Sequence, residues 1–276
     1  MGTSLPLICV VGPTASGKSA RAVALAKELT GEVISVDSRQ VYTMLDIGTE
    51  KTSTKEMQGI PHHLIDICDP RDTYSAADFV RDAERLIDDI TARGKRPILA
   101  GGTHFYFEAL LYGLPKTQPV DEARRRQLET LSTEELVSRL QASDPRRAER
   151  IDVHNRRRLV RALEIVAEHG HVPERDTKHP HYGVEWVVIN PEREVVRERI
   201  AERLEKAFAR GLVEEVERVR DYVGDERLHE LGLEYRIIGE YLRGDRGQES
   251  LLPVLSTKLW HYARHQKAWL RKLLNS

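Results

Sequence analysis

A short run of apolar residues leads into a glycine-rich segment, and a helical pattern follows it. The segment has the form G-x-x-x-x-G-K-[ST], and its members are Gly12, Pro13, Thr14, Ala15, Ser16, Gly17, Lys18 and Ser19. Glycines let the backbone curl, so that successive N–H groups point at one cluster of phosphate oxygens. The helix start adds partial positive charge, Lys18 adds a full charge, and the Ser19 hydroxyl is a ligand for Mg²⁺. The flanking strand and helix favour a phosphate-binding loop over an incidental glycine-rich turn.

The composition limits the class of protein to which the chain can belong. With 276 residues, 40% of them hydrophobic and 32% charged, it is typical of a globular protein with one large domain, or one domain and an insertion. No apolar stretch approaches the ~20 residues of a membrane helix, and we expect no signal peptide before the first strand. Cys9 and Cys68 are the two cysteines, too few for a disulfide framework. We therefore expect a monomer in the reducing cytoplasm, with no membrane partner.

Strands and helices alternate along the chain. The predicted strands cover residues 5–11, 32–37, 97–100 and 184–189. The first two predicted helices cover residues 18–29 and 75–93, and Ser75-Ala76-Ala77-Asp78 is a capping box that opens the second. This order predicts an α/β fold: a parallel sheet of the P-loop NTPase type, flanked by helices.

Residues 121–150 interrupt this alternation, because they are polar, arginine-rich and helical in pattern, with no strand. They predict a helical insertion. The expected boundaries are 1–115 for the first part of the P-loop core, 116–153 for the insertion, and 154–276 for the second part of the core with its C-terminal helices.

Polar side chains follow the ends of predicted strands. Asp37 ends the second strand, and Thr103 follows Gly101-Gly102 after the next. Because parallel strands present their carboxyl ends at one edge, these residues and the phosphate loop should converge on one crevice. Asp37-Ser38-Arg39-Gln40 can hydrogen-bond a nucleobase edge and supply a general base. The alternative is that Asp37 only caps a turn by accepting from backbone N–H groups.

Several segments together resemble the tRNA dimethylallyltransferase (isopentenyltransferase) family. The resemblance covers nearly the whole chain, and several of its motifs are more specific than the phosphate loop alone. Besides that loop, the matching segments are Asp37–Tyr42, Asp46–Thr49, Pro61–Asp66, Tyr74–Phe79, Pro97–Thr103, Arg158–Glu164, Gly211–Val216 and Tyr262–Gln266.

The resemblance implies transfer of a dimethylallyl group from dimethylallyl diphosphate to N6 of the adenosine 3′ of the anticodon in tRNA. The phosphate loop would then hold the diphosphate leaving group, with Mg²⁺ on Ser19. Asp37 is the expected base for the adenine amine. Thr103 is expected to position the reacting groups, although a plain helix N-cap role fits it comparably well.

Basic and polar residues are the candidate contacts for RNA. Ser38, Arg39 and Gln40 adjoin the expected base, and Arg157, Arg158 and Arg161 lie in a basic stretch with an apolar inner face. A second stretch is the C-terminal helix, which carries its candidates at helical spacing: Trp260, Arg264, Lys267 and Arg271. Arginines beside an aromatic ring suit phosphates and unpaired bases. A solvated helix face is the alternative for both stretches.

The chain departs from the family pattern at two places. The family usually continues Gly-Gly-Thr with Gly-Leu-Tyr, whereas this chain has His104-Phe105-Tyr106. Where the family has Ile-Gly-Tyr-Lys-Glu, this chain has Leu231–Arg236, and His229 stands where an upstream arginine helps to bind diphosphate. Arg236 and Arg227 are the candidate replacements for that arginine.

Three other functions remain open at the level of sequence. One keeps the donor but transfers to a free adenine nucleotide, and the two basic stretches argue against it. A second is a small-molecule kinase that binds ATP at the loop and uses Asp37 to activate a hydroxyl. The third is a non-catalytic protein that binds RNA or nucleotide with the same fold.

Overall fold

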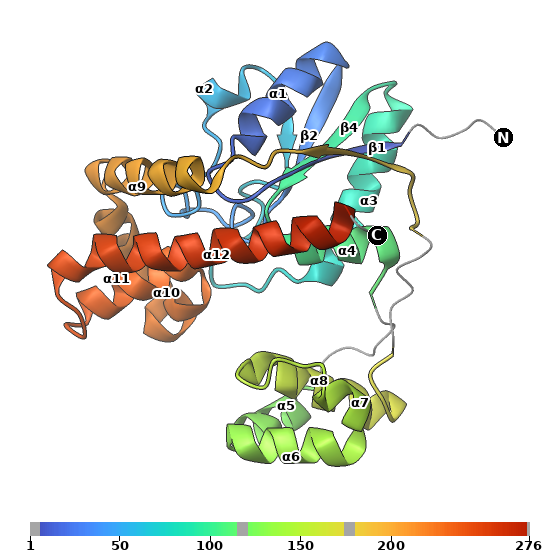
Figure 1. The fold of residues 1–276 in the computed structure, drawn as a ribbon, viewed down its shortest axis with the longest axis vertical. Coiled ribbons are helices and arrows are strands. Elements are labelled where there is room, and N and C mark those ends of the chain that lie inside the picture. The colour runs from blue at the N-terminus through green and yellow to red at the C-terminus, as the bar shows by residue number, and fades with distance from the viewer. Residues whose placement is uncertain (1–5, 115–120, 174–179, 275–276) are drawn as a thin grey trace. The chain divides into compact units, whose positions relative to one another are not determined.

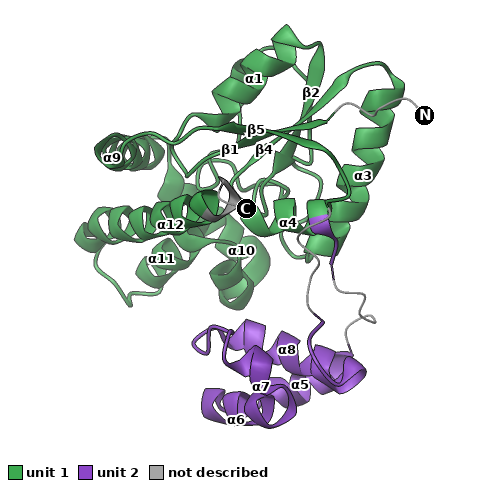
Figure 2. Cartoon of the chain, turned by 45° about the vertical axis from the view of Figure 1, so that its right-hand side comes forward, with its two compact units in different colours: residues 1–111, 180–276 green, residues 112–179 purple. Residues whose placement is uncertain are grey.

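The chain forms two compact units in a computed structural model that describes residues 6–114, 121–173 and 180–274. Unit 1 comprises residues 1–111 and 180–276, and unit 2 comprises Tyr112–His179 (Figure 2). Within the described part of the chain, no helix is long and apolar enough to cross a membrane. Both cysteines are free thiols; Cys9 is buried and Cys68 is half-buried.

Unit 1 is built on a five-stranded parallel sheet with the order β3-β2-β4-β1-β5. Its strands are β1 (Leu7–Val11), β2 (Gly31–Val36), β3 (His62–His63), β4 (Arg96–Gly101) and β5 (Val184–Val188). The expected α/β fold with a parallel sheet is therefore confirmed. β3, a two-residue edge strand, is an addition that the residue pattern did not indicate.

Alternate residues of the strands bury themselves under helices on opposite faces of the sheet. Ile8 and Val10 pack with α1 (Lys18–Glu28), whereas Cys9 packs on the other face with α3 (Ala76–Ala92) and α4 (His104–Tyr112). The capping box that opens α3 is formed, because the Ser75 side chain accepts from Asp78 N and the Asp78 carboxylate accepts from Ser75 N. Figure 1 shows α1 and α3 flanking the sheet.

A second hydrophobic core of unit 1 joins its C-terminal helices to the segment that follows β2. The helices are α9 (Arg193–Ala209), α10 (Leu212–Glu230), α11 (Leu233–Leu242) and α12 (Leu251–Leu274). Their apolar faces pack around Val41, Tyr42 and Leu45. Because these three residues lie just past the end of β2, the helices cover the carboxyl edge of the sheet. The short helices α2 (Thr54–Met57) and η1 (Gln248–Ser250) complete the unit.

Unit 2 is a small helical domain with its own core. It contains α5 (Glu122–Glu129), α6 (Thr133–Ser143), α7 (Pro145–Ala148) and α8 (Arg156–His169). Its core includes Leu128, Leu136, Leu140, Leu159 and Leu163.

This domain corrects one expected boundary. The sequence places residues 154–169 in the second part of the P-loop core, but the apolar face of α8 packs on α5 and α6, so the insertion continues to His179. The other expected boundary, between residues 115 and 116, lies outside the described residues.

Candidate active site

The glycine-rich segment forms a loop between β1 and α1. Gly12 must be glycine here, because a Cβ at this position would lie 2.4 Å from the carbonyl oxygen of Ile189. Gly17 is the N-cap of α1 and has a φ of 93°, a left-handed conformation that favours glycine. Lys18 begins the helix, and its ammonium group donates to the carbonyl of Pro13 at 2.8 Å. The loop therefore presents backbone N–H groups and a helix N-terminus to one space.

Side chains from α9 and α12 hold this loop in place. Gln266 is buried, its Oε1 accepts from Thr14 N at 2.7 Å, and its Nε2 donates to Gly102 O at 3.0 Å. Arg203 donates to Thr14 Oγ1 at 2.6 Å, and Arg199 donates to Ser16 O at 3.3 Å. The conformation of the loop is thus fixed by residues 183 to 252 positions away in the sequence.

A cavity of about 400 Å³ lies over the loop, and we call it the phosphate cavity. Lys18, Arg203 and Arg210 line it, together with the carboxylates of Asp37 and Glu50. Burial lowers the pKa of Lys18 to about 8, and the neighbouring charge of Asp37 opposes that shift. A buried ammonium beside two guanidinium groups favours an anion with several negative charges.

Asp37 and Thr103 come together at the edge of the sheet, as the sequence predicts. Asp37 Oδ1 accepts from Arg39 N at 2.8 Å and from Gln40 N at 3.3 Å, so this oxygen does cap a turn. Within the described residues, Asp37 Oδ2 has no hydrogen-bond partner. The Thr103 hydroxyl accepts from Ser38 N at 3.0 Å, which ties the two strand ends together. The hydroxyl thus binds the segment after β2 rather than capping α4.

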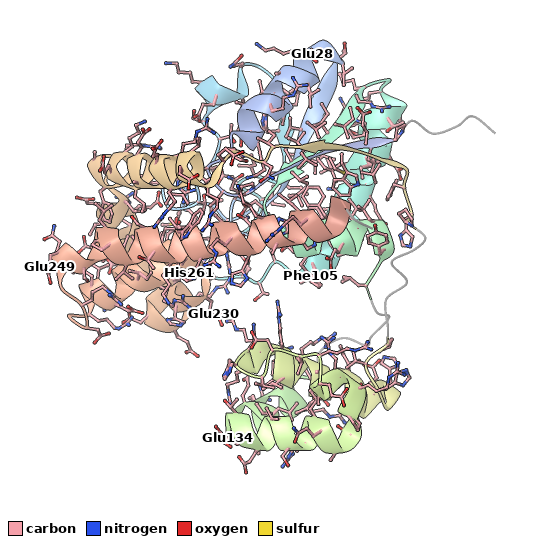
Figure 3. All side chains as sticks on the ribbon, in the orientation of Figure 1. Glu28, Phe105, Glu134, Glu230, Glu249 and His261 are labelled. Carbon is pink, nitrogen blue, oxygen red and sulfur yellow. The ribbon has the colours of Figure 1, made fainter. Side chains whose placement is uncertain are left out.

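A second cavity, of about 520 Å³, adjoins the first, and we call it the base cavity. Asp37, Ser38, Arg39 and Thr103 line one side of it. The other side comes from α11 and α12, including His261, which Figure 3 labels on α12. Five residues line both cavities: Thr14, Asp37, Thr49, Arg203 and Tyr262. The carboxylate of Asp37 therefore stands at the junction of an anion site and a larger, more apolar space.

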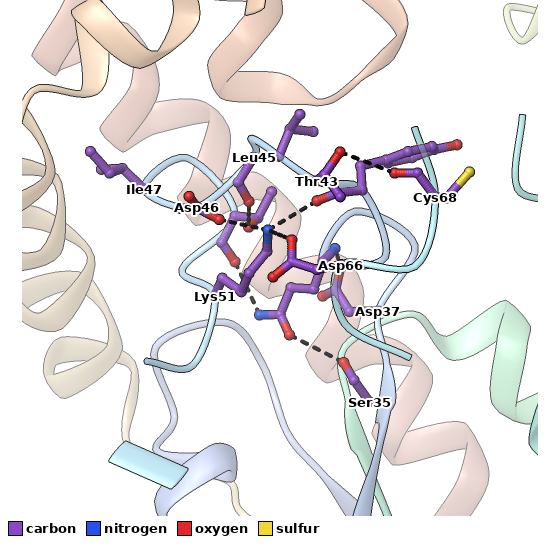
Figure 4. Close-up of polar contacts among 12 residues, drawn as sticks. Ser35, Asp37, Thr43, Leu45, Asp46, Ile47, Lys51, Asp66 and Cys68 are labelled. Atoms are coloured by element: carbon purple, nitrogen blue, oxygen red, sulfur yellow. Dashed lines mark hydrogen bonds and ion pairs between the residues drawn. The ribbon is translucent and has the colours of Figure 1, made fainter. Parts of the chain in front are cut away.

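Gln40 is held inside the structure by its side-chain amide. Its Oε1 accepts from Ser35 Oγ at 3.1 Å, and its Nε2 donates to the carbonyls of Thr49 and Glu50 at 3.2 and 3.1 Å. Lys51 extends this network by donating to Asp46 and to the Tyr42 carbonyl (Figure 4). Gln40 lines the phosphate cavity rather than the base cavity, so the structure gives it a role in shaping the loop at residues 49–50.

A buried carboxylate fixes the neighbouring turn. Glu215 on α10 accepts from the backbone N–H groups of Asp46, Ile47 and Gly48 at 3.1, 2.7 and 2.9 Å, and from Tyr235 Oη at 2.7 Å. These bonds satisfy a carboxylate that is only 2% exposed. They also place Gly48 on the wall of the base cavity.

The two departures from the family pattern have clear places in the fold. The ring of His104 stacks on Trp269 with 4.1 Å between ring centroids, and burial lowers its pKa to about 4, helped by the charge of Lys18. His104 is therefore a neutral packing residue. Leu231–Tyr235 lines the base cavity, and Glu234 accepts from Arg203 at 3.3 Å.

Neither expected replacement arginine lines the phosphate cavity. Arg227 is occupied elsewhere, since it donates to Pro70 O at 2.8 Å and pairs with Glu230 at 2.9 Å. Arg236 is absent from both cavity walls among the described residues. Arg203 and Arg210 of the α9 region supply the guanidinium groups instead.

Arg157, Arg158 and Arg161 lie on α8 of unit 2 and not in the core unit. Arg157 and Arg158 are exposed. Arg161 is half-buried and donates to Glu164 at 2.9 Å, a buried carboxylate that also binds Arg125. The expectation that these arginines contact RNA stays a prediction.

Three site residues were not predicted to have their observed roles. The residue pattern assigns no role to Arg203, and Glu215 and Gln266 appear only as members of segments that match the family. The sequence does mark the surroundings of two of them, because Glu215 lies within Gly211–Val216 and Gln266 within Tyr262–Gln266, and both segments match the family. Which distant atoms they contact is a property of the folded chain.

The parallel sheet, with a phosphate-binding loop at its carboxyl edge, defines an α/β protein of the P-loop type. The family model described as IPP transferase matches residues 40–273, and the chain belongs to the IPP transferase family.

Relatives with curated names cover almost the whole chain. It is 43% identical over 282 residues to the tRNA dimethylallyltransferase of Thermomicrobium roseum. This match covers 99% of this chain and 85% of that protein. It is 40% identical over 273 residues to the tRNA dimethylallyltransferase of an Exiguobacterium species, and the match covers 96% of this chain and 87% of that protein.

Solved structures also share the fold. The tRNA isopentenylpyrophosphate transferase of Bacillus halodurans is 36% identical with a TM-score of 0.73, and the match covers 97% of this chain and 87% of that one. A eukaryotic dimethylallyltransferase, described as acting on tRNA, is 28% identical with a TM-score of 0.83. That match covers 97% of this chain and 70% of the other.

Proposed function

We propose that the protein transfers a dimethylallyl group from dimethylallyl diphosphate to N6 of the adenosine 3′ of the anticodon in tRNA. The observation that carries this proposal is the position of Asp37, at the junction between an anion site and a second cavity large enough for a base. The relatives, which are named tRNA dimethylallyltransferases, support transfer of a dimethylallyl group to tRNA.

The phosphate cavity suits a diphosphate leaving group. When the C1–O bond of the donor breaks, negative charge develops on the departing diphosphate. The phosphate loop, Lys18 and Arg203 line this cavity, and their donors would stabilise the charge. Because Gln266 and Arg203 fix Thr14, the donors are preorganised rather than recruited.

The base cavity suits the acceptor adenine. The N6 lone pair is delocalised into the ring, so removal of a proton as the C1–N6 bond forms makes the amine a better nucleophile. Asp37 Oδ2 would accept that proton, while Oδ1 keeps the turn that orients the carboxylate. Tyr262, which lines both cavities, offers an aromatic face to the base outside its stack.

Mg²⁺ is the proposed cofactor, and the donor set fits a hard cation. The Ser19 hydroxyl and the carboxylate of Glu50 line the cavity where the diphosphate would lie. The described part of the chain contains no cluster of three or more metal-binding side chains, so phosphate oxygens and water would complete the coordination. Bound there, Mg²⁺ would add charge stabilisation for the leaving group.

Contacts to the tRNA are proposed for two groups of residues. Ser38 and Arg39 line the base cavity and would hold the nucleotide next to Asp37. Arg157, Arg158 and Arg161 on unit 2 would bind RNA backbone. We further propose that the protein acts as a monomer in the cytoplasm, as free thiols and the tRNA substrate would suit.

The donor can be tested directly by comparing two labelled compounds. With dimethylallyl diphosphate labelled in the prenyl group, we expect label in RNA and release of diphosphate in the presence of Mg²⁺. With ATP labelled at the γ-phosphate, we expect no labelled product. Phosphoryl transfer from ATP without any need for the allyl donor would instead establish the kinase alternative.

A further inference from the structure

A third cavity of unit 1, of about 610 Å³, lies along the outer side of α12 next to the start of α9. We call it the α12 groove and define it by Arg193, Trp260, Arg264, Lys267 and Arg271. Positions 260, 264, 267 and 271 share one face of the helix, because they recur at three- and four-residue spacing. Arg264 and Arg271 lie about 10 Å apart along the helix axis, at 1.5 Å per residue.

The groove gathers positive charge that the protein itself does not neutralise. Among the described residues, no carboxylate lines it. Within the described residues, none of Arg193, Arg264 and Arg271 forms an ion pair, whereas buried carboxylates elsewhere, such as Glu32 and Glu164, each hold two cations. Lys267 is oriented by donation to the carbonyl of Pro191. In a chain of net charge −1, such a cluster attracts an anionic ligand.

Trp260 gives the groove an aromatic surface in a fixed orientation. The guanidinium groups of Arg193 and Arg197 lie over its ring, 5.5 and 5.3 Å from the centroid. The indole also packs against the core of the C-terminal helices, and the part of its ring that stays exposed could stack an unpaired base or a sugar while the cations bind phosphates. This combination fits a single-stranded nucleic acid better than a small free anion, which needs no ring.

The groove adjoins the base cavity, because His261 and His265 line both spaces. An RNA strand that lies along α12 would therefore bring its next nucleotide to the cavity that holds Asp37. A target base taken out of its stack would enter the base cavity, and the adjacent phosphates would then lie along α12.

We propose that the α12 groove binds the sugar–phosphate backbone of the acceptor RNA directly beside the target nucleotide. This inference rests on the proposed function, since it takes the acceptor to be RNA. It assigns Arg264 and Arg271 to phosphate contacts and Trp260 to stacking.

The test compares two pairs of glutamine variants. Arg264→Gln with Arg271→Gln removes two groove charges, and Arg85→Gln with Arg218→Gln removes two exposed charges on α3 and α10 as a matched control. The dissociation constant of an anticodon stem-loop RNA is measured at several salt concentrations, together with KM for dimethylallyl diphosphate. The groove variant should bind RNA roughly 10-fold more weakly, with a salt slope reduced by about 1 to 2, and with an unchanged donor KM.

Two results would overturn the assignment. One is an RNA affinity and salt slope equal to those of the control pair while the wild-type protein modifies the stem-loop. The other is a raised KM for dimethylallyl diphosphate with unchanged RNA affinity, which would show that the groove binds the diphosphate and not RNA. If the wild-type protein neither binds nor modifies RNA, the proposed function itself fails, and the transfer assay shows this independently of the variants.

Discussion

The two carboxylate oxygens of Asp37 have different proposed roles, one structural and one catalytic. Oδ1 accepts two backbone N–H groups and builds the turn after β2, while Oδ2 has no hydrogen-bond partner among the described residues and is the proposed base. A variant that removes the whole side chain would therefore confuse loss of the turn with loss of the base. Asparagine separates the two, because its carbonyl oxygen can keep the turn but its amide cannot take a proton.

For Asp37→Asn, we predict a loss of turnover of about 10²- to 10⁴-fold, the usual range for a positioned base. Binding of inorganic diphosphate should stay close to that of the wild type, because the base acts on the acceptor. Single-turnover transfer and diphosphate titration measure the two effects separately. Wild-type turnover in this variant would remove Asp37 from the role of base.

Lys18 makes donor binding depend on pH. Its pKa is lowered to about 8, below its ordinary value, so the free protein loses this positive charge as the pH rises through about 8. Diphosphate affinity should therefore fall progressively above pH 8. Lys18→Arg keeps its charge throughout this range, so its affinity should be nearly flat up to pH 9.5. A wild-type affinity that stays constant from pH 7 to 9.5 would contradict the shifted pKa.

At the scale of elements, helices distant in sequence build the wall of the site. α10 holds the turn at residues 46–48 through Glu215, and α9 and α12 hold the phosphate loop through Arg203 and Gln266. Each of these contacts buries a polar group whose partner would otherwise lack a hydrogen bond.

For Glu215→Ala, we expect a loss of about 3 kcal/mol of unfolding free energy, because three backbone N–H groups and the Tyr235 hydroxyl lose their acceptor. Urea unfolding followed by circular dichroism measures this loss. Glu214→Ala is the matched control, since Glu214 is the exposed neighbour on the same helix and should change stability by less than about 0.5 kcal/mol. Equal stability of the two variants would show that the carboxylate does not hold the turn.

The basic end of α8 predicts a role for unit 2 in RNA binding. Arg157→Gln with Arg158→Gln should weaken stem-loop binding several-fold and lower the salt slope by about 1 to 2. Arg161 is left unchanged, because it pairs with Glu164 inside the unit. Arg124→Gln with Arg126→Gln on α5 removes the same charge and serves as the control. If both double variants have the same salt slope, the arginines of α8 do not contact RNA and form a solvated helix face.

At the scale of the whole molecule, local signals predicted most of the sheet and the residues at its edge. The apolar run, glycine loop and helix start are contiguous, so β1, the loop and α1 follow from neighbouring residues alone. Asp37 and Thr103 were found by the same logic, because parallel strands end at one edge. The residues that complete the site could not be found this way: Arg203 lies 189 residues from its partner Thr14, and Gln266 lies 252 residues from it.

The misplaced boundary has a similar cause. The pattern of α8 shows that Leu159 and Leu163 face a core, but an amphipathic helix does not specify which core it covers. Both the sheet and the small helical bundle were available partners. The insertion therefore includes α8 and extends beyond the arginine-rich stretch at residues 121–150 from which it was predicted.

The most direct test of the central claim is the identity of the acceptor atom. The wild-type protein, Mg²⁺ and labelled dimethylallyl diphosphate are incubated in parallel with free AMP, with an anticodon stem-loop, and with the same stem-loop carrying guanosine in place of the adenosine 3′ of the anticodon. We predict label only in the adenosine stem-loop, recovered on digestion as an N6-dimethylallyl adenosine. Label on AMP, or equal label on both stem-loops, would contradict the account.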